Sequence, residues 1–474
     1  MLVRTLAAAG PIGAMTLFGA LTSCGNDAAR GTRDSEVDST AVDDIGAWDN
    51  GKQEFAKTYC VRPPGPTYGA GDGSSWTDAF ADLPEELERG ARYLIASGNY
   101  DEAAPQGDEP YTDYAFDDRE DGDQFIAVVK ATAGDHGTDE GWKASLAQGP
   151  AVFGPVSMAT GHYLLDGVEG TGNSGHGIRI VVNPAVCTDS HANAFYFAWN
   201  AQSHYVGLHH LDISFCGGVG DPAEPAQDAI YGYMTDSYDV GHVTIRDSYV
   251  HDTKRVLAFF LGWKDVLLER SFFERSGQHH ESSSLAMRDA RHVIVRNNVF
   301  KDAINVFVSL QDVRDVHIYG NVFVSTLAGW DIWNSIHSSE LMRNVFVHNN
   351  TFYGLTGLST GFRFTSTTTN VQVNNNLWAH NRTNQIPMAG EHDFNAFYDN
   401  IRPDSGEDLS RAVEEDHVQV MGDDPFQDAA SLDFHLRTPT DPGQTLEAIY
   451  SRDPDGKARG EDGSWDRGAF EYEQ

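Results

Sequence analysis

Residues 293–300 read Val-Ile-Val-Arg-Asn-Asn-Val-Phe, and this pattern recurs along the second half of the 474-residue chain. In each copy a polar residue stands five positions after the first valine, and an aromatic residue usually follows two positions later. The copies begin at Val243, Val266, Val293, Val316, Val345 and Val371, so the successive spacings are 23, 27, 23, 29 and 26 residues. Such alternation predicts short strands with one buried face, repeated with loops of variable length.

The polar and aromatic positions predict two ladders that run along a stack of coils. The polar column is Ser248, Ser271, Asn298, Asn321, Asn350 and Asn376, and the aromatic column is Phe273, Phe300, Phe323, Phe352 and Trp378. An Asn side chain can hydrogen-bond to the next rung, about 4.8 Å away, and it tolerates tight turns. A single coil cannot bury its apolar side, so stacking must supply the core.

A third apolar run completes each coil, at residues 256–263, 284–289, 304–312 and 361–365. The sequence therefore predicts an all-β right-handed parallel β-helix with three strands per coil and about nine coils over residues 160–400. These repeats resemble the pectate-lyase-like superfamily. Because open sheet ends invite aggregation, we expect residues 52–159 to form an N-terminal cap and residues 401–474 a C-terminal capping segment.

The N-terminus indicates export. An apolar run follows Arg4 and ends at Leu21; it is too short, and too interrupted by Gly and Pro, to span a membrane. Leu21-Thr22-Ser23-Cys24 resembles the bacterial lipobox, which implies a signal peptide at residues 1–23 and a lipid on Cys24. The polar residues 24–51 predict a flexible tether. We therefore expect a bacterial lipoprotein that touches the membrane only through its lipid.

The charge balance limits the partners. The chain has 33 Lys and Arg against 70 Asp and Glu, a formal charge of −37, which repels nucleic acid. This acidity either offers oxygen ligands to Ca²⁺ or simply solvates the surface. Besides Cys24, the chain has Cys60, Cys187 and Cys216, of which the last two are the better candidates for a disulfide. A monomer is expected.

The loop His279-His280-Glu281, together with the stretch that it leads into, ending at Arg288, resembles the alginate lyase and chondroitinase B family. The resemblance implies that Glu281 helps to hold Ca²⁺, and it places Arg288 and Gln311 where that family has a Lys and an Arg. β-Elimination needs a cation to neutralise the uronate carboxylate and a base of suitable pKa. Arg288 is a poor base, since arginine stays protonated, but it can neutralise a carboxylate. His279 or His280 could be the base, or both could be solvated loop residues.

Three further sets of residues are candidates. Asp289 and Asp312 occupy equivalent positions on adjacent coils, about 4.8 Å apart, near the roughly 5 Å of a retaining glycosidase pair; they could equally be turn residues. Two positions before successive valines stand four cations, which could bind a polyanionic glycan or pair with Asp265 and Asp315: Lys264, Arg291, Arg314 and Arg343. Trp330 and Trp333 could stack on sugar rings or pack in the core.

The leading hypothesis is a surface-anchored protein that binds an extracellular, acidic polysaccharide and, if it is an enzyme, cleaves it by β-elimination with Ca²⁺ as the candidate cofactor. Two alternatives remain open. One is a non-catalytic, adhesive β-helix, and the other is a glycoside hydrolase that uses paired carboxylates.

Overall fold

The computed structural model describes Ile45, Trp48 and residues 53–101, 114–182, 193–197, 203–215, 228–233, 241–277, 282–327, 332–338, 341–364, 368–388 and 390–473. All of them belong to one unit, residues 42–474. Nearly all of its strands lie in three parallel sheets, A, B and C, and consecutive strands pass from one sheet to the next around the coil.

Sheet A has 13 strands, in the order β2 (Phe80–Ala81), β1 (Lys57–Arg62), β3 (Ala91–Ile95), β6 (Ile126–Lys130), β9 (Tyr163–Asp166), β12 (Val206–His209), β15 (Gly241–Arg246), β18 (Lys264–Glu269), β21 (Arg291–Arg296), β24 (Val313–Tyr319), β27 (Met342–His348), β31 (Thr368–Asn374) and β34 (Glu391–Asp393). Sheet B has 12 strands, in the order β36 (Gln419–Val420), β35 (Ala396–Tyr398), β32 (Leu377–Ala379), β28 (Thr351–Tyr353), β25 (Val322–Val324), β22 (Val299–Lys301), β19 (Phe272–Glu274), β16 (Tyr249–His251), β13 (Leu211–Ser214), β10 (Ile178–Val181), β7 (Ala151–Phe153) and β4 (Gly98–Asn99).

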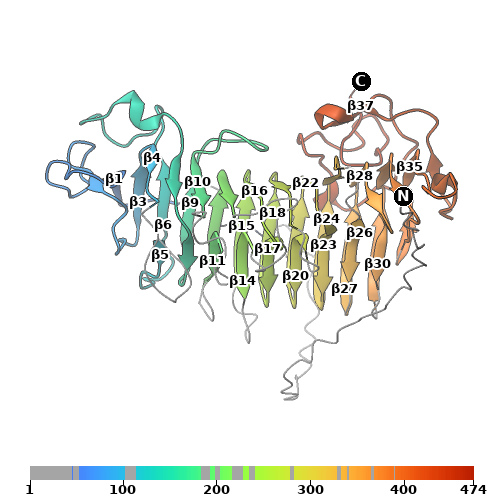
Figure 1. Cartoon of the computed structure of the whole chain (residues 1–474), viewed down its shortest axis with the longest axis horizontal. Helices are drawn as coiled ribbons and strands as arrows, with labels where there is room; N and C mark the ends of the chain where they lie inside the picture. The colour runs from blue at the N-terminus through green and yellow to red at the C-terminus, as the bar shows by residue number, and fades with distance from the viewer. Residues whose placement is uncertain are drawn as a thin grey trace, which may run out of the picture. The chain divides into compact units, whose positions relative to one another are not determined.

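Sheet C has 11 strands, in the order β33 (Arg382–Thr383), β29 (Thr356–Gly357), β26 (Ile332–Ser338), β23 (Asn305–Gln311), β20 (Ser283–Arg288), β17 (Val256–Leu261), β14 (Ile230–Tyr233), β11 (Phe195–Phe197), β8 (Val156–Met158) and β5 (Tyr114–Phe116), with β30 (Phe362–Phe364) also paired to β26. Figure 1 shows strands of successive coils side by side. Outside the three sheets lie the antiparallel pair β37 (Phe426–Asp428) and β38 (Asp433–Leu436) and the 3-10 helices Ala144–Ala147, Leu409–Arg411, Ala429–Ser431 and Ala448–Tyr450.

This topology confirms the predicted fold, a right-handed parallel β-helix with three strands per coil, as in the pectate-lyase-like superfamily. Between residues 160 and 400, sheet A contributes nine strands: β9, β12, β15, β18, β21, β24, β27, β31 and β34. The boundary expected at residue 160, however, is not a fold boundary, since β1, β3 and β6 already belong to the same sheet. These first coils escaped the sequence pattern because their strands start 35 and 37 residues apart, at Ala91, Ile126 and Tyr163.

Both predicted ladders are present. The backbone N–H of Asn298 donates to Oδ1 of Asn321 at 2.9 Å, and that of Asn321 donates to Oδ1 of Asn350 at 3.0 Å. The ladder extends one rung further than the sequence predicted, to Asn395. Inside the core, the aromatic rings stack with centroids 4.8–5.3 Å apart, in the order Phe273, Phe300, Phe323, Phe352, Trp378 and Phe397. Each coil is therefore held to the next by buried hydrogen bonds and by ring contacts.

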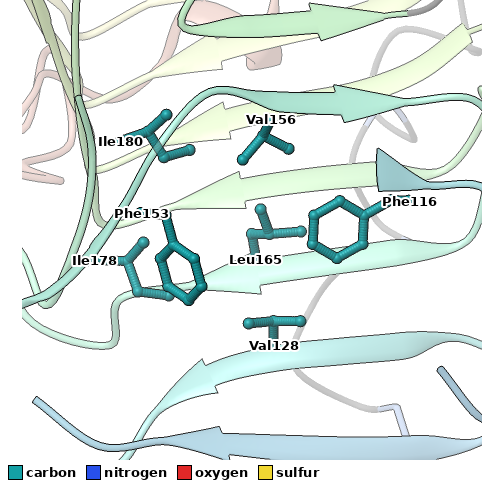
Figure 2. A pocket seen from close by; sticks show the side chains of 7 residues that line it. All are labelled: Phe116, Val128, Phe153, Val156, Leu165, Ile178 and Ile180. Atoms are coloured by element: carbon teal, nitrogen blue, oxygen red, sulfur yellow. The ribbon is translucent and has the colours of Figure 1, made fainter. Parts of the chain in front are cut away.

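The core is apolar where all three sheets meet. Figure 2 shows seven side chains around a small cavity in the early coils, all of them hydrocarbon at their tips: Phe116, Val128, Phe153, Val156, Leu165, Ile178 and Ile180. A cavity without a polar group offers nothing to orient a sugar or an ion. This cavity is therefore a gap in packing rather than a ligand site.

The segment after residue 400 closes the end only in part. Leu409 is buried in the main core, and Glu415 accepts hydrogen bonds from the N–H and the side-chain amide of Asn395. The rest packs against the sides of the helix in two apolar clusters. One cluster joins Phe426, Phe434, Leu436 and Ala469 to residues of sheet B that include Val322, Val324 and Leu377. The other joins Tyr450 and Trp465 to Leu267, Ile294 and Tyr319 of sheet A. The C-terminal segment thus covers outward faces of sheets A and B.

Within the described part of the chain, no helix has the length and apolar character needed to cross a membrane.

Candidate functional site

The outer face of sheet C carries a short ladder of aromatic rings. Tyr196 pairs with Tyr231 in register, and Tyr231 pairs with Phe259. Their ring centroids are 6.0 and 5.3 Å apart, and both pairs are stacked. The flanking residues Phe195 and Phe197 point into the core, so strand alternation turns Tyr196 outward. Tyr196 and Tyr231 are half-buried, whereas Phe259 is only 4% exposed and packs with Val256 and Ala286 in a small apolar cluster.

Two arginines border this ladder. The guanidinium carbons of Arg255 and Arg288 lie 5.6 and 5.3 Å from the centroid of the Phe259 ring. Arg255 is fixed by the buried Asp228, whose oxygens accept bonds from Nε at 2.9 Å and Nη2 at 2.5 Å. Among the described residues, no carboxylate pairs with Arg288. The Arg288 side chain is partly exposed.

Sheet C differs from the other two sheets in charge. Its eleven strands contain no Asp or Glu, although the whole chain has 70. Sheets A and B both contain acidic residues, such as Glu269 and Glu274. Beyond Phe259, the outward column of sheet C continues through Ala286, Ser309, His337 and Arg363. Burial, followed by the charge of Arg363, lowers the pKa of His337. Burial raises the pKa of Tyr231 to about 12, so its hydroxyl stays neutral.

The predicted column of cations lies across a tight corner from Arg288. Each of its members is in register with the next on sheet A, in the order Lys264, Arg291, Arg314 and Arg343. Only Asp289 and Ala290 separate Arg288, at the end of β20, from Arg291, at the start of β21. We call these four cations together with Arg288 and Gln311 the basic corner. All six side chains are partly exposed.

Asp265 and Asp315, the expected partners of the cations, have other partners of their own. His292 contacts Asp265 at 3.1 Å and Asp315 at 3.9 Å. The side-chain amide of Asn344 donates to Asp315 at 2.6 Å. Asp265 and Asp315 therefore make contacts along the neighbouring column, with His292 and Asn344.

The structure brings Arg288 and Gln311 together as direct neighbours in register, as the sequence indicated. Asp289 and Asp312 lie at the turn, with left-handed φ angles of 49° and 50°. Asp adopts this conformation more readily than most residues, which favours the turn interpretation of the pair.

Other predicted residues lie outside the described part of the chain: His279, His280, Glu281, Trp330, Cys24, Cys187 and Cys216. Trp333 belongs to β26 of sheet C, but its side chain is not among those described. The expected base, calcium ligand, lipid attachment and disulfide thus remain predictions.

Sequence reasoning missed Tyr196 and Tyr231. The available signal was the alternation in Phe195-Tyr196-Phe197 and Ile230-Tyr231-Gly232, where the outward position has a polar-tipped ring. Their coils precede the regular valine repeat, so no register was available from which to place them on one face.

A family model described as the periplasmic copper-binding protein NosD matches residues 230–401, which is 172 of the 474 residues. In the described part of the chain, His, Cys, Asp and Glu side chains converge in a group of three only at Glu120, His162 and His204, outside that range. The described residues within 230–401 therefore present no ready set of copper ligands of these types.

Among solved structures, pectate lyase Pel9A is 16% identical with a TM-score of 0.47, and the match covers 89% of this chain and 98% of that one. The Streptococcus pneumoniae surface adhesin PfbA is 14% identical with a TM-score of 0.33, covering 76% and 87%. The PL6 family alginate lyase AlyGC is 12% identical with a TM-score of 0.32, covering 77% and 53%. No curated protein matches the sequence. At these TM-scores the likenesses carry no functional argument, and function must be argued from the surface itself.

Proposed function

We propose that this protein binds an acidic polysaccharide along the outer face of sheet C and the adjoining basic corner. The observation that carries the proposal is the exclusion of Asp and Glu from every strand of sheet C in a chain of charge −37. A polyanion approaching any other face meets carboxylates, and on this face it meets Arg288 and the basic corner.

The aromatic ladder supplies the second component of such a site. A sugar ring presents an apolar face that stacks on aromatic side chains, and the tyrosine hydroxyls offer hydrogen bonds at the edge. Arg288 can hold a carboxylate or sulfate with two parallel hydrogen bonds. Because coils repeat along the helix, stacked rings and a row of cations suit a chain of repeated sugars better than a single small molecule.

In this proposal the protein is exported and held at a bacterial membrane through a lipid on Cys24. The NosD family is described as periplasmic, which supports export. The C-terminal segment covers parts of sheets A and B, which supports sheet C as the binding face.

The catalytic extension of this proposal is β-elimination. Arg288 would neutralise the uronate carboxylate, His279 or His280 would remove the proton, and Ca²⁺ held with Glu281 would assist. A non-catalytic adhesin would use the same surface without the base. The pair of Asp289 and Asp312 at left-handed turns makes hydrolysis the weaker candidate.

The test is a binding and cleavage panel with purified protein. The probes are alginate, polygalacturonate, chondroitin sulfate and neutral glycans, each with Ca²⁺ or with EDTA. Binding is measured by calorimetry, elimination by the ultraviolet absorbance of the new double bond, and hydrolysis by reducing ends. We expect binding to at least one acidic glycan and none to neutral ones.

Two variants locate the site. Arg288→Ala should weaken binding about tenfold or more, since a hydrogen bond to a charged group contributes about 1.5–3 kcal/mol. The control is Arg179→Ala, which removes an arginine on sheet B that pairs with Asp212 at 2.8 Å. If no acidic glycan binds, or if both variants bind as the wild type does, the proposal is wrong.

A further inference from the structure

Three side chains from three separate segments converge near the early coils. Glu120 lies in the loop between β5 and β6, His162 directly precedes β9, and His204 lies shortly before β12, which pairs with β9. Glu120 Oε1 is 3.6 Å from Nδ1 of His162 and 3.6 Å from Nε2 of His204. The potential ligand atoms of all three residues lie within 4.8 Å of one another.

These distances are too long for hydrogen bonds and are right for ligands of one ion. A good N–H···O bond spans about 2.7–3.2 Å. Two ligands that bind one ion tetrahedrally at about 2.1 Å stand roughly 3.4 Å apart. The measured separations of 3.6 Å are close to that value.

His162 supplies independent evidence for a ligand. It is only 5% exposed, and its Nδ1, which points toward Glu120, has no hydrogen-bond partner among the described residues. Leaving a buried polar nitrogen unpaired is costly, so such atoms call for a partner.

The surroundings hold the three groups in place. The backbone N–H of Gly161 donates to Glu120 Oε1 at 2.8 Å, and Tyr205 stacks on the His162 ring at 5.0 Å. The other nitrogen of His162, Nε2, lies 4.0 Å from Asp123. At this distance the exposed Asp123 carboxylate makes no hydrogen bond to the ring.

We propose that Glu120, His162 and His204 bind a divalent transition-metal ion of the Zn²⁺ class. Two imidazoles and one carboxylate suit Zn²⁺, Ni²⁺ or Co²⁺ better than Ca²⁺, which prefers oxygen ligands only. Three protein ligands leave one position open to water or to another ligand. The ion would join the acidic loop at residues 117–123 to two coils and so stabilise this part of the helix. This site is separate from the binding surface on sheet C, and neither proposal depends on the other.

The experiment uses the full chain, freed of metal with a chelator and then titrated with Zn²⁺ in a calorimeter. We expect one ion per chain and a melting temperature that rises with Zn²⁺. Co²⁺ should give the visible absorption of a tetrahedral site. Glu120→Gln keeps an acceptor for the Gly161 N–H but removes the charge, and we expect it to weaken Zn²⁺ binding at least tenfold. His162→Gln should do the same.

The control variant is His292→Gln. His292 occupies the same kind of left-handed corner on sheet A and contacts two carboxylates, Asp265 and Asp315, but among the described residues it belongs to no group of three converging ligand atoms. It should bind Zn²⁺ as the wild type does. Circular dichroism checks that each variant is folded. The proposal is overturned if the wild type binds no stoichiometric Zn²⁺, if Glu120→Gln binds it equally well, or if His292→Gln loses it as completely.

Discussion

Replacing Asn321 by leucine tests the polar ladder that holds the coils together. Asn321 is fully buried. Its Oδ1 accepts the N–H of Asn298 at 2.9 Å, and its Nδ2 donates to the carbonyl of Val295 at 2.8 Å. Leucine has a similar volume but can make neither bond. Two buried groups are left unpaired at about 1–3 kcal/mol each, so we expect a loss of about 4 kcal/mol.

The effect should also be local, because each coil contacts mainly its neighbours. Native-state hydrogen exchange resolved by peptide should show the largest loss of protection in β22, β25 and β28, and urea unfolding gives the total. The matched control is Asn370→Leu, at an exposed corner where the amide donates to Asn344 at 2.9 Å and accepts from the side chain of Gln372 at 3.2 Å. Its φ of 53° predicts a loss of about 1 kcal/mol from left-handed strain. If Asn321→Leu costs no more than this control, the ladder does not stabilise the fold as argued.

Three further predictions concern acid stability and binding. Burial lowers the pKa of His317 to about 4 and that of His348 to about 3, from 6.5, so both stay neutral when folded. The contribution of the neutral histidines to the free energy of unfolding is complete above about pH 6.5 and is lost as the pH falls toward 4, by about 3 kcal/mol for His317. Thermal unfolding at pH 7 and at pH 4.5 measures this loss of stability. In the variant His317→Gln, the difference in stability between the two pH values should be smaller. Tyr231→Ala should weaken glycan binding about fivefold while Tyr231→Phe leaves it nearly unchanged, because stacking contributes about 1 kcal/mol; equal losses would disprove stacking. Raising the salt concentration should weaken the binding of acidic glycans, because exposed charges are screened. If calorimetry finds the same affinity at low and high salt, the basic corner does not contribute to binding.

The regular coils could be predicted because each carries its own register. Within eight residues, Val293 marks the buried strand, Asn298 marks the polar ladder and Phe300 marks the ring stack. The structure contains all three columns. The first coils have long loops between Ala91, Ile126 and Tyr163, and no Asn column, so the sequence does not align their strands and predicts a cap in their place.

The binding surface was predictable in part for a related reason. Arg288 and Gln311 stand at fixed distances from the valine repeat, so their adjacency followed from the sequence. Their closeness to Lys264 and Arg291 depends on a corner that only the structure defines. The proposed metal ligands Glu120, His162 and His204 are far apart in the sequence. Glu120 lies in a loop, whereas His162 and His204 lie just before strands of sheet A, so no local sequence spacing predicts that the three residues meet.

The most direct test of the central claim is hydroxyl-radical footprinting of the protein with and without the acidic glycan that binds best in the panel. Mass spectrometry would report the oxidation of each tyrosine. We predict protection of Tyr196 and Tyr231 on sheet C, with no change at Tyr59 on sheet A or Tyr398 on sheet B. Protection of Tyr59 or Tyr398 in their place, or no protection of sheet C, would contradict the assignment of this face.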